Sequence, residues 1–193
     1  TFQRFVDTYG LDPRAGPRKK PQLRTQPSHE ELAKAKKKAA KVFLSHAWAK
    51  DKLGRDNHER VSRINEGLRE RQIDTWFDSQ GDMRGDTLQA MTEGIDECSL
   101  VAVCITREYI EKCKKKDNDN CKLEFEYAYN RKKVNNLISV VMEPDCANPG
   151  SWDGPVGAAL ASQLYVDCKG DTDADFERAL DDIEARIKRW RGS

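Results

Sequence analysis

The sequence has few of the residues that build metal sites, and their spacing is unfavourable for one. Its 193 residues include only three histidines, and its six cysteines contain no C-x-x-C pair. This composition argues against a zinc site, and we expect no bound metal. Cys104 lies inside an apolar run, where a reduced cysteine behaves as a small hydrophobic residue. We therefore expect free thiols, no disulfide framework and a reducing, cytoplasmic environment.

Long apolar runs and phosphate-binding loops are missing as well. The longest apolar run, Leu100 to Ile105, is far shorter than the ~20 residues of a membrane helix, and no apolar leader opens the sequence. Neither G-x-G-x-x-G nor G-x-x-x-x-G-K-[ST] follows any expected strand, which excludes a Rossmann dehydrogenase and a P-loop NTPase. A phosphorelay receiver needs an acidic pair after its first strand, where this chain has Ser45 and His46.

The charge is distributed unevenly, although the net charge is only +1. Residues 1–40 carry ten Lys/Arg and four Asp/Glu, which gives +6 and leaves −5 for residues 41–193. Four of the seven prolines lie before residue 28, so we predict a basic, proline-containing linker or tail over 1–40, with a marginal helix from Ser28 to Ala40. Because no aromatic residues are interleaved with the basic run, we do not expect nucleic-acid binding.

From residue 41 onward the pattern predicts alternating strands and helices. Short apolar runs are typical of buried parallel strands, and the segments between them have apolar residues at helical spacing. The expected strands are 42–44, 73–77, 100–105, 137–142 and 164–166, and the expected helices are 57–72, 87–98, about 121–133 and a last one capped by 172–175. We predict an α/β domain over 41–193 with a doubly wound, five-stranded parallel sheet flanked by helices.

Three motifs stand in order at the ends of these strands. They are Val42-Phe43-Leu44-Ser45, then Trp76-Phe77-Asp78 with Met83-Arg84-Gly85-Asp86, and finally Cys121-Lys122-Leu123-Glu124-Phe125. Together they resemble the TIR (Toll/interleukin-1 receptor/resistance protein) domain, a flavodoxin-like fold. The sequence departs from the family pattern at Asn120, where a tryptophan is usual, and at His46-Ala47-Trp48, where plant members have F-R-G.

The resemblance implies one of two activities in immune or cell-death signalling. NAD-cleaving members use the glutamate of this motif, here Glu124, to break the nicotinamide–ribose bond; NAD is then the substrate and no cofactor is needed. Adaptor members act without catalysis, through TIR–TIR self-association, which we expect here in either case. The residues expected to contact NAD are Ser45, His46, Trp48, Phe77, Asp78, Arg84 and Ala128.

Helix geometry supports Glu124 as the catalytic carboxylate. We expect it in the first turn of its helix, at the carboxyl edge of the sheet, where the helix dipole favours the ionised form. Ala128 follows on the same face at i+4 and leaves room there. Glu126 lies about 200° around the helix and cannot share the pocket. A single carboxylate is sufficient, because nicotinamide leaves as a neutral molecule and needs no proton.

Overall fold

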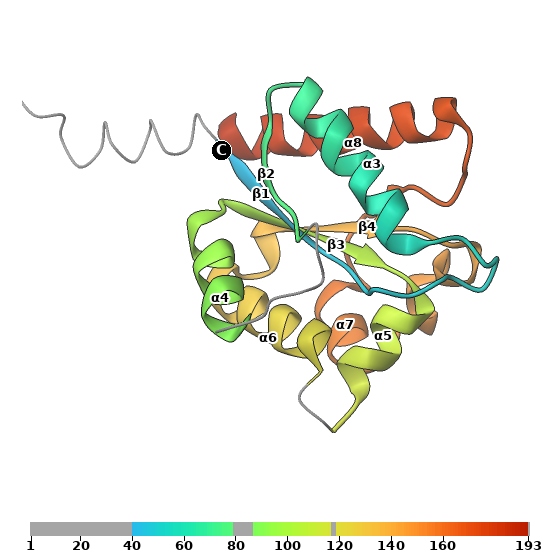
Figure 1. The fold of residues 1–193 in the computed structure, drawn as a ribbon. Coiled ribbons are helices and arrows are strands. Elements are labelled where there is room, and N and C mark those ends of the chain that lie inside the picture. Colours follow the sequence, from blue (N-terminus) through green and yellow to red (C-terminus); the bar gives the residue numbers. More distant parts are fainter. Residues whose placement is uncertain (1–39, 79–86, 117–118, 193) are drawn as a thin grey trace, which may run out of the picture. The chain divides into compact units, whose positions relative to one another are not determined.

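Figure 1 presents a computed structural model of the chain, which describes residues 40–78, 87–116 and 119–192. The predicted tail and its marginal helix lie outside these residues, apart from Ala40, and so does the loop that contains Arg84. In chain order the elements are β1 (Lys41–Ser45), α3 (Asn57–Glu70), β2 (Asp74–Trp76), α4 (Thr87–Glu97), β3 (Leu100–Ile105), α5 (Arg107–Lys114), α6 (Asn120–Lys132), η1 (Val134–Asn136), β4 (Leu137–Val141), η2 (Pro144–Cys146), η3 (Pro149–Ser151), α7 (Gly154–Leu160), β5 (Val166–Asp167) and α8 (Asp173–Gly192).

The sheet has five parallel strands in the order β2-β1-β3-β4-β5. The chain crosses from β1 to β2 on one side and returns to β3 on the other side of β1, so the connections diverge between β1 and β3. This is the topological switch point, where open α/β sheets bind their ligands at the carboxyl ends of the strands. The predicted doubly wound fold is confirmed.

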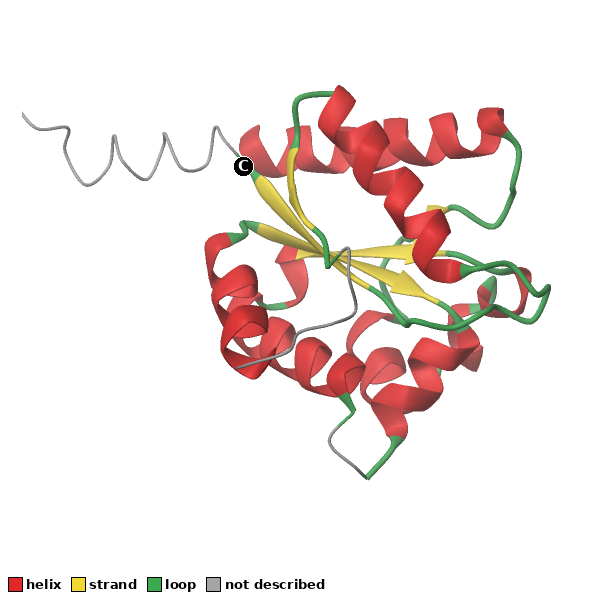
Figure 2. Ribbon diagram, viewed as in Figure 1, coloured by secondary structure: helices red, strands yellow, loops and turns green. Residues whose placement is uncertain are grey.

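Helices cover both faces of the sheet, as Figure 2 shows. Val42 and Leu44 point to the face covered by α3 and α8, while Phe43 points to the face covered by α4, α5, α6 and α7. The alternation follows from the two-residue period of a strand. Side chains of β3 are buried throughout, which explains its continuous apolar sequence.

Some segments differ from the prediction. No helix was predicted between the third strand and residue 121, but α5 begins directly after β3, with Thr106 accepting a hydrogen bond from the Tyr109 backbone N–H at 3.1 Å. Its lysines obscure a short buried stripe of Tyr109, Ile110 and Cys113. Helix α7 was not predicted either. The last strand begins at Val166 instead of Leu164, whose side chain is 82% exposed.

Two arginines, the buried Arg60 and the half-buried Arg55, lie at the carboxyl edge beyond β4 and β5. Arg60 donates to the carbonyl oxygens of Met142 at 2.7 Å and Cys168 at 2.8 Å. Arg55 also donates to Met142, and its guanidinium is paired with the buried Asp51 at 2.7 Å. Burying these charges is tolerated because their donors are satisfied. These hydrogen bonds therefore tie the segments that follow β4 and β5 to α3 and to the connection before it.

We expect Arg60→Ala to lower the free energy of unfolding by about 3 kcal/mol, because it leaves buried carbonyl groups without donors. Chemical denaturation measures the change. Arg63→Ala is the matched control, since Arg63 lies one turn away, is 41% exposed and pairs with the exposed Asp173; it should change stability by less than about 1 kcal/mol. Equal losses in the two variants would contradict this role of Arg60.

Candidate active site

Three side chains from different elements meet at the switch point. Ser45 ends β1, Tyr109 lies in α5 after β3, and Glu124 lies in α6. The Ser45 hydroxyl lies 2.8 Å from the Tyr109 hydroxyl and donates a hydrogen bond to Glu124 Oε2 at 2.8 Å. Ser45 and Tyr109 are buried, at 1% and 0% exposure.

The hydrogen-bond count fixes the direction of this relay. A serine hydroxyl has one proton, and Ser45 gives it to Glu124. Tyr109 must therefore donate to Ser45, so the relay runs from Tyr109 through Ser45 to the carboxylate. The position of Glu124 is thus set by the end of β1 and by α5, in addition to its own helix.

The electrostatics of Glu124 differ from the prediction. The pKa of Glu124 is raised to about 7, mainly by burial; the hydrogen bond from Ser45 opposes the rise, and the charges of Asp78 and Asp119 contribute to it. The helix begins at Asn120 after the cap Asp119, so Glu124 lies just beyond the first turn. The expected first-turn position is therefore wrong, and the expected preference for the ionised form is wrong as well, because desolvation outweighs the helix dipole.

A cluster of four rings lies beside this relay. His58 stacks on Trp48, with ring centroids 3.6 Å apart, and on Phe77 at 4.9 Å. His46 lies within stacking distance of His58 and of Phe77, at 5.1 and 5.3 Å. Trp48 is 43% exposed, so the cluster presents an aromatic surface to solvent.

A hydrogen bond between the two histidines holds the cluster together. His46 Nδ1 lies 3.2 Å from the Leu44 carbonyl oxygen, which can only accept, so Nδ1 carries a proton. Burial lowers the pKa of His46 to about 4, which leaves the ring neutral and its Nε2 an acceptor. His58 Nδ1 therefore donates to His46 Nε2 at 2.8 Å.

His58 was not among the residues that we predicted for the site. It is the second residue of α3, two positions after the cap Asp56, and α3 is the helix that follows β1. A helix that follows a strand in a parallel sheet begins at the carboxyl edge of the sheet. The place of His58 at the start of such a helix could therefore have marked it as a candidate site residue. Its pairing with His46 depends on the folded path between residues 46 and 58.

Asp78 connects the relay and the ring cluster through its charge. It raises the pKa of Glu124, and it partly opposes the lowering of the pKa values of His46 and His58 by burial. Cys121, one turn before Glu124, donates from its thiol to the His46 carbonyl oxygen at 3.6 Å. Relay and rings therefore belong to one site.

Ala128, which we predicted to contact NAD, lies in the core instead of on a site surface. Ala128 is 1% exposed and belongs to the buried cluster under α6. Within the described ranges, no three His, Cys, Asp or Glu residues are grouped so that they could hold a metal. The same residues contain no helix long and apolar enough to cross a membrane.

The sequence model of the TIR domain family matches residues 42–182. The chain belongs to the TIR domain family. A search of curated proteins finds no match to it. The matched range runs from the start of β1 into α8 and includes the whole candidate site.

TIR domains are signalling domains, and the family includes NAD-cleaving enzymes. In this TIR domain the position before Cys121 is Asn120, and the cap of α6 is Asp119, whose carboxylate accepts from the Cys121 backbone N–H at 3.0 Å. No tryptophan stands at position 120, and the aromatic surface of the site comes from Trp48 after β1, His58 of α3 and Phe77 after β2.

The raised pKa of Glu124 predicts a stability cost that depends on pH. Below about pH 4.5 the carboxyl group is protonated in both states, whereas above pH 7 the folded TIR domain holds a charge that the unfolded chain solvates better. A shift of one pKa unit corresponds to about 1.4 kcal/mol, and partial exposure of Glu124 reduces the total. We expect Glu124→Gln to gain about 1–2 kcal/mol relative to wild type between pH 4 and pH 8.5.

Denaturation curves at the two pH values measure this gain. Glutamine keeps an oxygen that can accept from Ser45, so the relay remains intact. Glu126→Gln is the control, because Glu126 is exposed on the same helix and should show no such difference. A Glu124→Gln variant with the same relative stability at both pH values would contradict the raised pKa.

Proposed function

We propose that this TIR domain is an NAD glycohydrolase, with Glu124 as its catalytic carboxylate. The observation that carries the proposal is the Glu124 carboxylate at the switch point, held by Ser45 beside an exposed aromatic cluster. Cleavage of NAD needs a carboxylate that stabilises the cation formed on the ribose, and a flat surface on which a heterocyclic ring can stack. Membership of a family that includes NAD-cleaving enzymes supports it further.

The chemistry requires one bond to break and one to form. The bond between the nicotinamide nitrogen and the ribose carbon breaks, and its electron pair leaves with nicotinamide, which becomes neutral. The ribose carbon becomes an oxocarbenium-like centre, which the negative charge of Glu124 stabilises. Water then forms the new carbon–oxygen bond and releases a proton, which gives ADP-ribose. Attack by a ring nitrogen of the adenine instead would give a cyclic product.

The relay and the rings have separate tasks in this proposal. Tyr109 and Ser45 hold the carboxylate and favour its ionised form through the hydrogen bond. Trp48 and His58 offer a stacked surface for a planar ring of the substrate, and His46 fixes the orientation of His58. His46 is a positioning residue, since its buried ring is already engaged at both nitrogens.

Glu124→Ala should reduce nicotinamide release from NAD at least a hundredfold, because removal of one electrostatic group of a transition state costs on the order of 10²–10³ in rate. Chromatographic assay of nicotinamide with purified protein at high concentration measures it. Glu126→Ala is the matched control and should retain wild-type activity. Full activity in Glu124→Ala would refute the assignment.

The pH dependence of kcat/KM gives an independent test. Activity should rise with pH through about 7 and then level off, because the ionised carboxylate is the active form. Ser45→Ala removes the hydrogen bond that lowers the pKa of Glu124, so its acidic limb should move to higher pH. Ser62→Ala on α3 is the control and should leave the limb in place. A limb that is the same in wild type and Ser45→Ala would contradict the relay.

Self-association without catalysis is the alternative function. TIR domains commonly self-associate, and an exposed groove lined by Phe125, Tyr129 and Pro155 offers an apolar surface between α6 and α7. A purified protein that assembles but releases no nicotinamide at any concentration would favour this alternative. All six cysteines are free and buried, which supports a reducing, cytoplasmic location for either function.

A further inference from the structure

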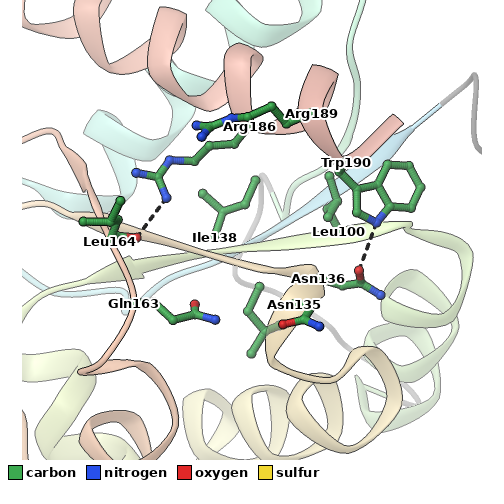
Figure 3. Close-up of a pocket in the computed structure, with 10 residues that line it drawn as sticks. Leu100, Asn135, Asn136, Ile138, Gln163, Leu164, Arg186, Arg189 and Trp190 are labelled. Atoms are coloured by element: carbon green, nitrogen blue, oxygen red, sulfur yellow. Dashed lines mark hydrogen bonds between the residues drawn. The ribbon is translucent and has the colours of Figure 1, made fainter. Parts of the chain in front are cut away.

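A cavity lies at the amino edge of the sheet, where β3 and β4 begin (Figure 3). Its volume is about 740 Å³, within the range of small-molecule sites. Leu100 and Ile138 lie at the starts of β3 and β4, and Trp190 lines the cavity from α8. The candidate active site follows the end of β1, so the two sites occupy opposite edges.

The cavity exists because β5 is short. Only Val140 and Val141 of β4 pair with β5, so within the described part of the chain residues 137–139 have no strand beside them on that side. The connection from α7 passes there instead and brings Gln163 to the rim. The missing strand leaves space next to the buried Ile138, and α8 lines it.

The charge of the cavity is positive. Arg186 and Arg189 of α8 line it, and its described lining contains no Asp or Glu. Arg186 donates to the Leu164 carbonyl at 2.8 Å, and among the described residues it pairs with one carboxylate, Asp182, at 3.5 Å. Arg189 is exposed and makes no hydrogen bond or ion pair with any described residue. A guanidinium group that still has free N–H donors favours a phosphate, which it can bind with two parallel hydrogen bonds.

Amide side chains complete the site. Asn136 accepts from the Trp190 indole N–H at 2.9 Å, which keeps its amide N–H groups available as donors. Gln163 donates to the Val134 carbonyl at 3.1 Å and keeps its carbonyl oxygen as an acceptor. The amide donors and acceptors suit the edge of a heterocyclic base, and the apolar surface beside them suits its face.

We propose that this cavity binds a phosphorylated nucleoside. The phosphates bind Arg186 and Arg189, and the base lies against Ile138 and Trp190 within reach of the amides. The site is separate from Glu124, so the proposal holds whether or not the TIR domain cleaves NAD.

Isothermal titration calorimetry with ADP as the probe tests the proposal. Wild type should bind ADP at least tenfold more tightly than adenosine, which lacks the phosphates, and than pyrophosphate, which lacks the base. Arg189→Glu should weaken ADP binding at least tenfold. Lys188→Glu makes the same charge change on the neighbouring residue, which is paired with Glu184 and does not line the cavity; it should change affinity less than twofold.

The controls separate this site from the candidate active site. If ADP binds at the carboxyl edge, Arg189→Glu will not change its affinity, and that result would overturn the proposal. Equal losses of ADP affinity in Arg189→Glu and Lys188→Glu would overturn it as well. Pyrophosphate that binds as tightly as ADP would overturn the assigned base. Nicotinamide release, measured in parallel, should be retained in Arg189→Glu if NAD is cleaved at Glu124, and its absence in wild type would leave the ADP result unaffected.

Discussion

The hydroxyl of Ser45 joins the three elements on which the candidate site depends. Ser45 is the last residue of β1, and its hydroxyl accepts a hydrogen bond from Tyr109 of α5 and donates one to Glu124 of α6. A parallel sheet brings the end of one strand and the helices that follow its neighbours to the same edge, and a side chain at the switch point can contact both. A small hydroxyl satisfies both partners at 2.8 Å. The catalytic geometry that we propose is therefore a consequence of the topology.

Two groups of charged side chains lie at the carboxyl edge of the sheet. Beyond β4 and β5 the charges of Arg55, Arg60 and Asp51 are paired or bound to carbonyl groups. Beyond β1 the surroundings of Glu124 raise its pKa to about 7, with a serine hydroxyl as its hydrogen-bond donor. A carboxylate in such an environment destabilises the folded state when it ionises, and it interacts more strongly with a substrate cation because less water screens it.

The sequence was sufficient to predict the sheet, because buried strands require continuous apolar runs and the helices between them keep a period of 3.6 residues. It also indicated Glu124 and Ser45, which belong to motifs at strand ends. It did not reveal Tyr109 as the third member of the relay, since lysines hide the short apolar stripe of α5. The pairing of His58 with His46, and the strength of burial at Glu124, depend on the three-dimensional packing of several segments and leave no pattern within one of them.

The error at the last strand has a structural consequence. The run Leu164-Tyr165-Val166 has the composition of a buried strand, and a strand over these residues would extend alongside the first half of β4. Instead only Val166 and Asp167 pair with β4, and the preceding residues leave the sheet. Backbone that leaves a sheet early exposes the edge of its neighbour, which another element must cover. Helix α8 covers it with long cationic side chains, Arg186 and Arg189, which cannot close the space as an apolar strand would. A short strand and a basic helix face thus combine to form a cavity at the amino edge, on the same sheet that carries the candidate active site at its carboxyl edge.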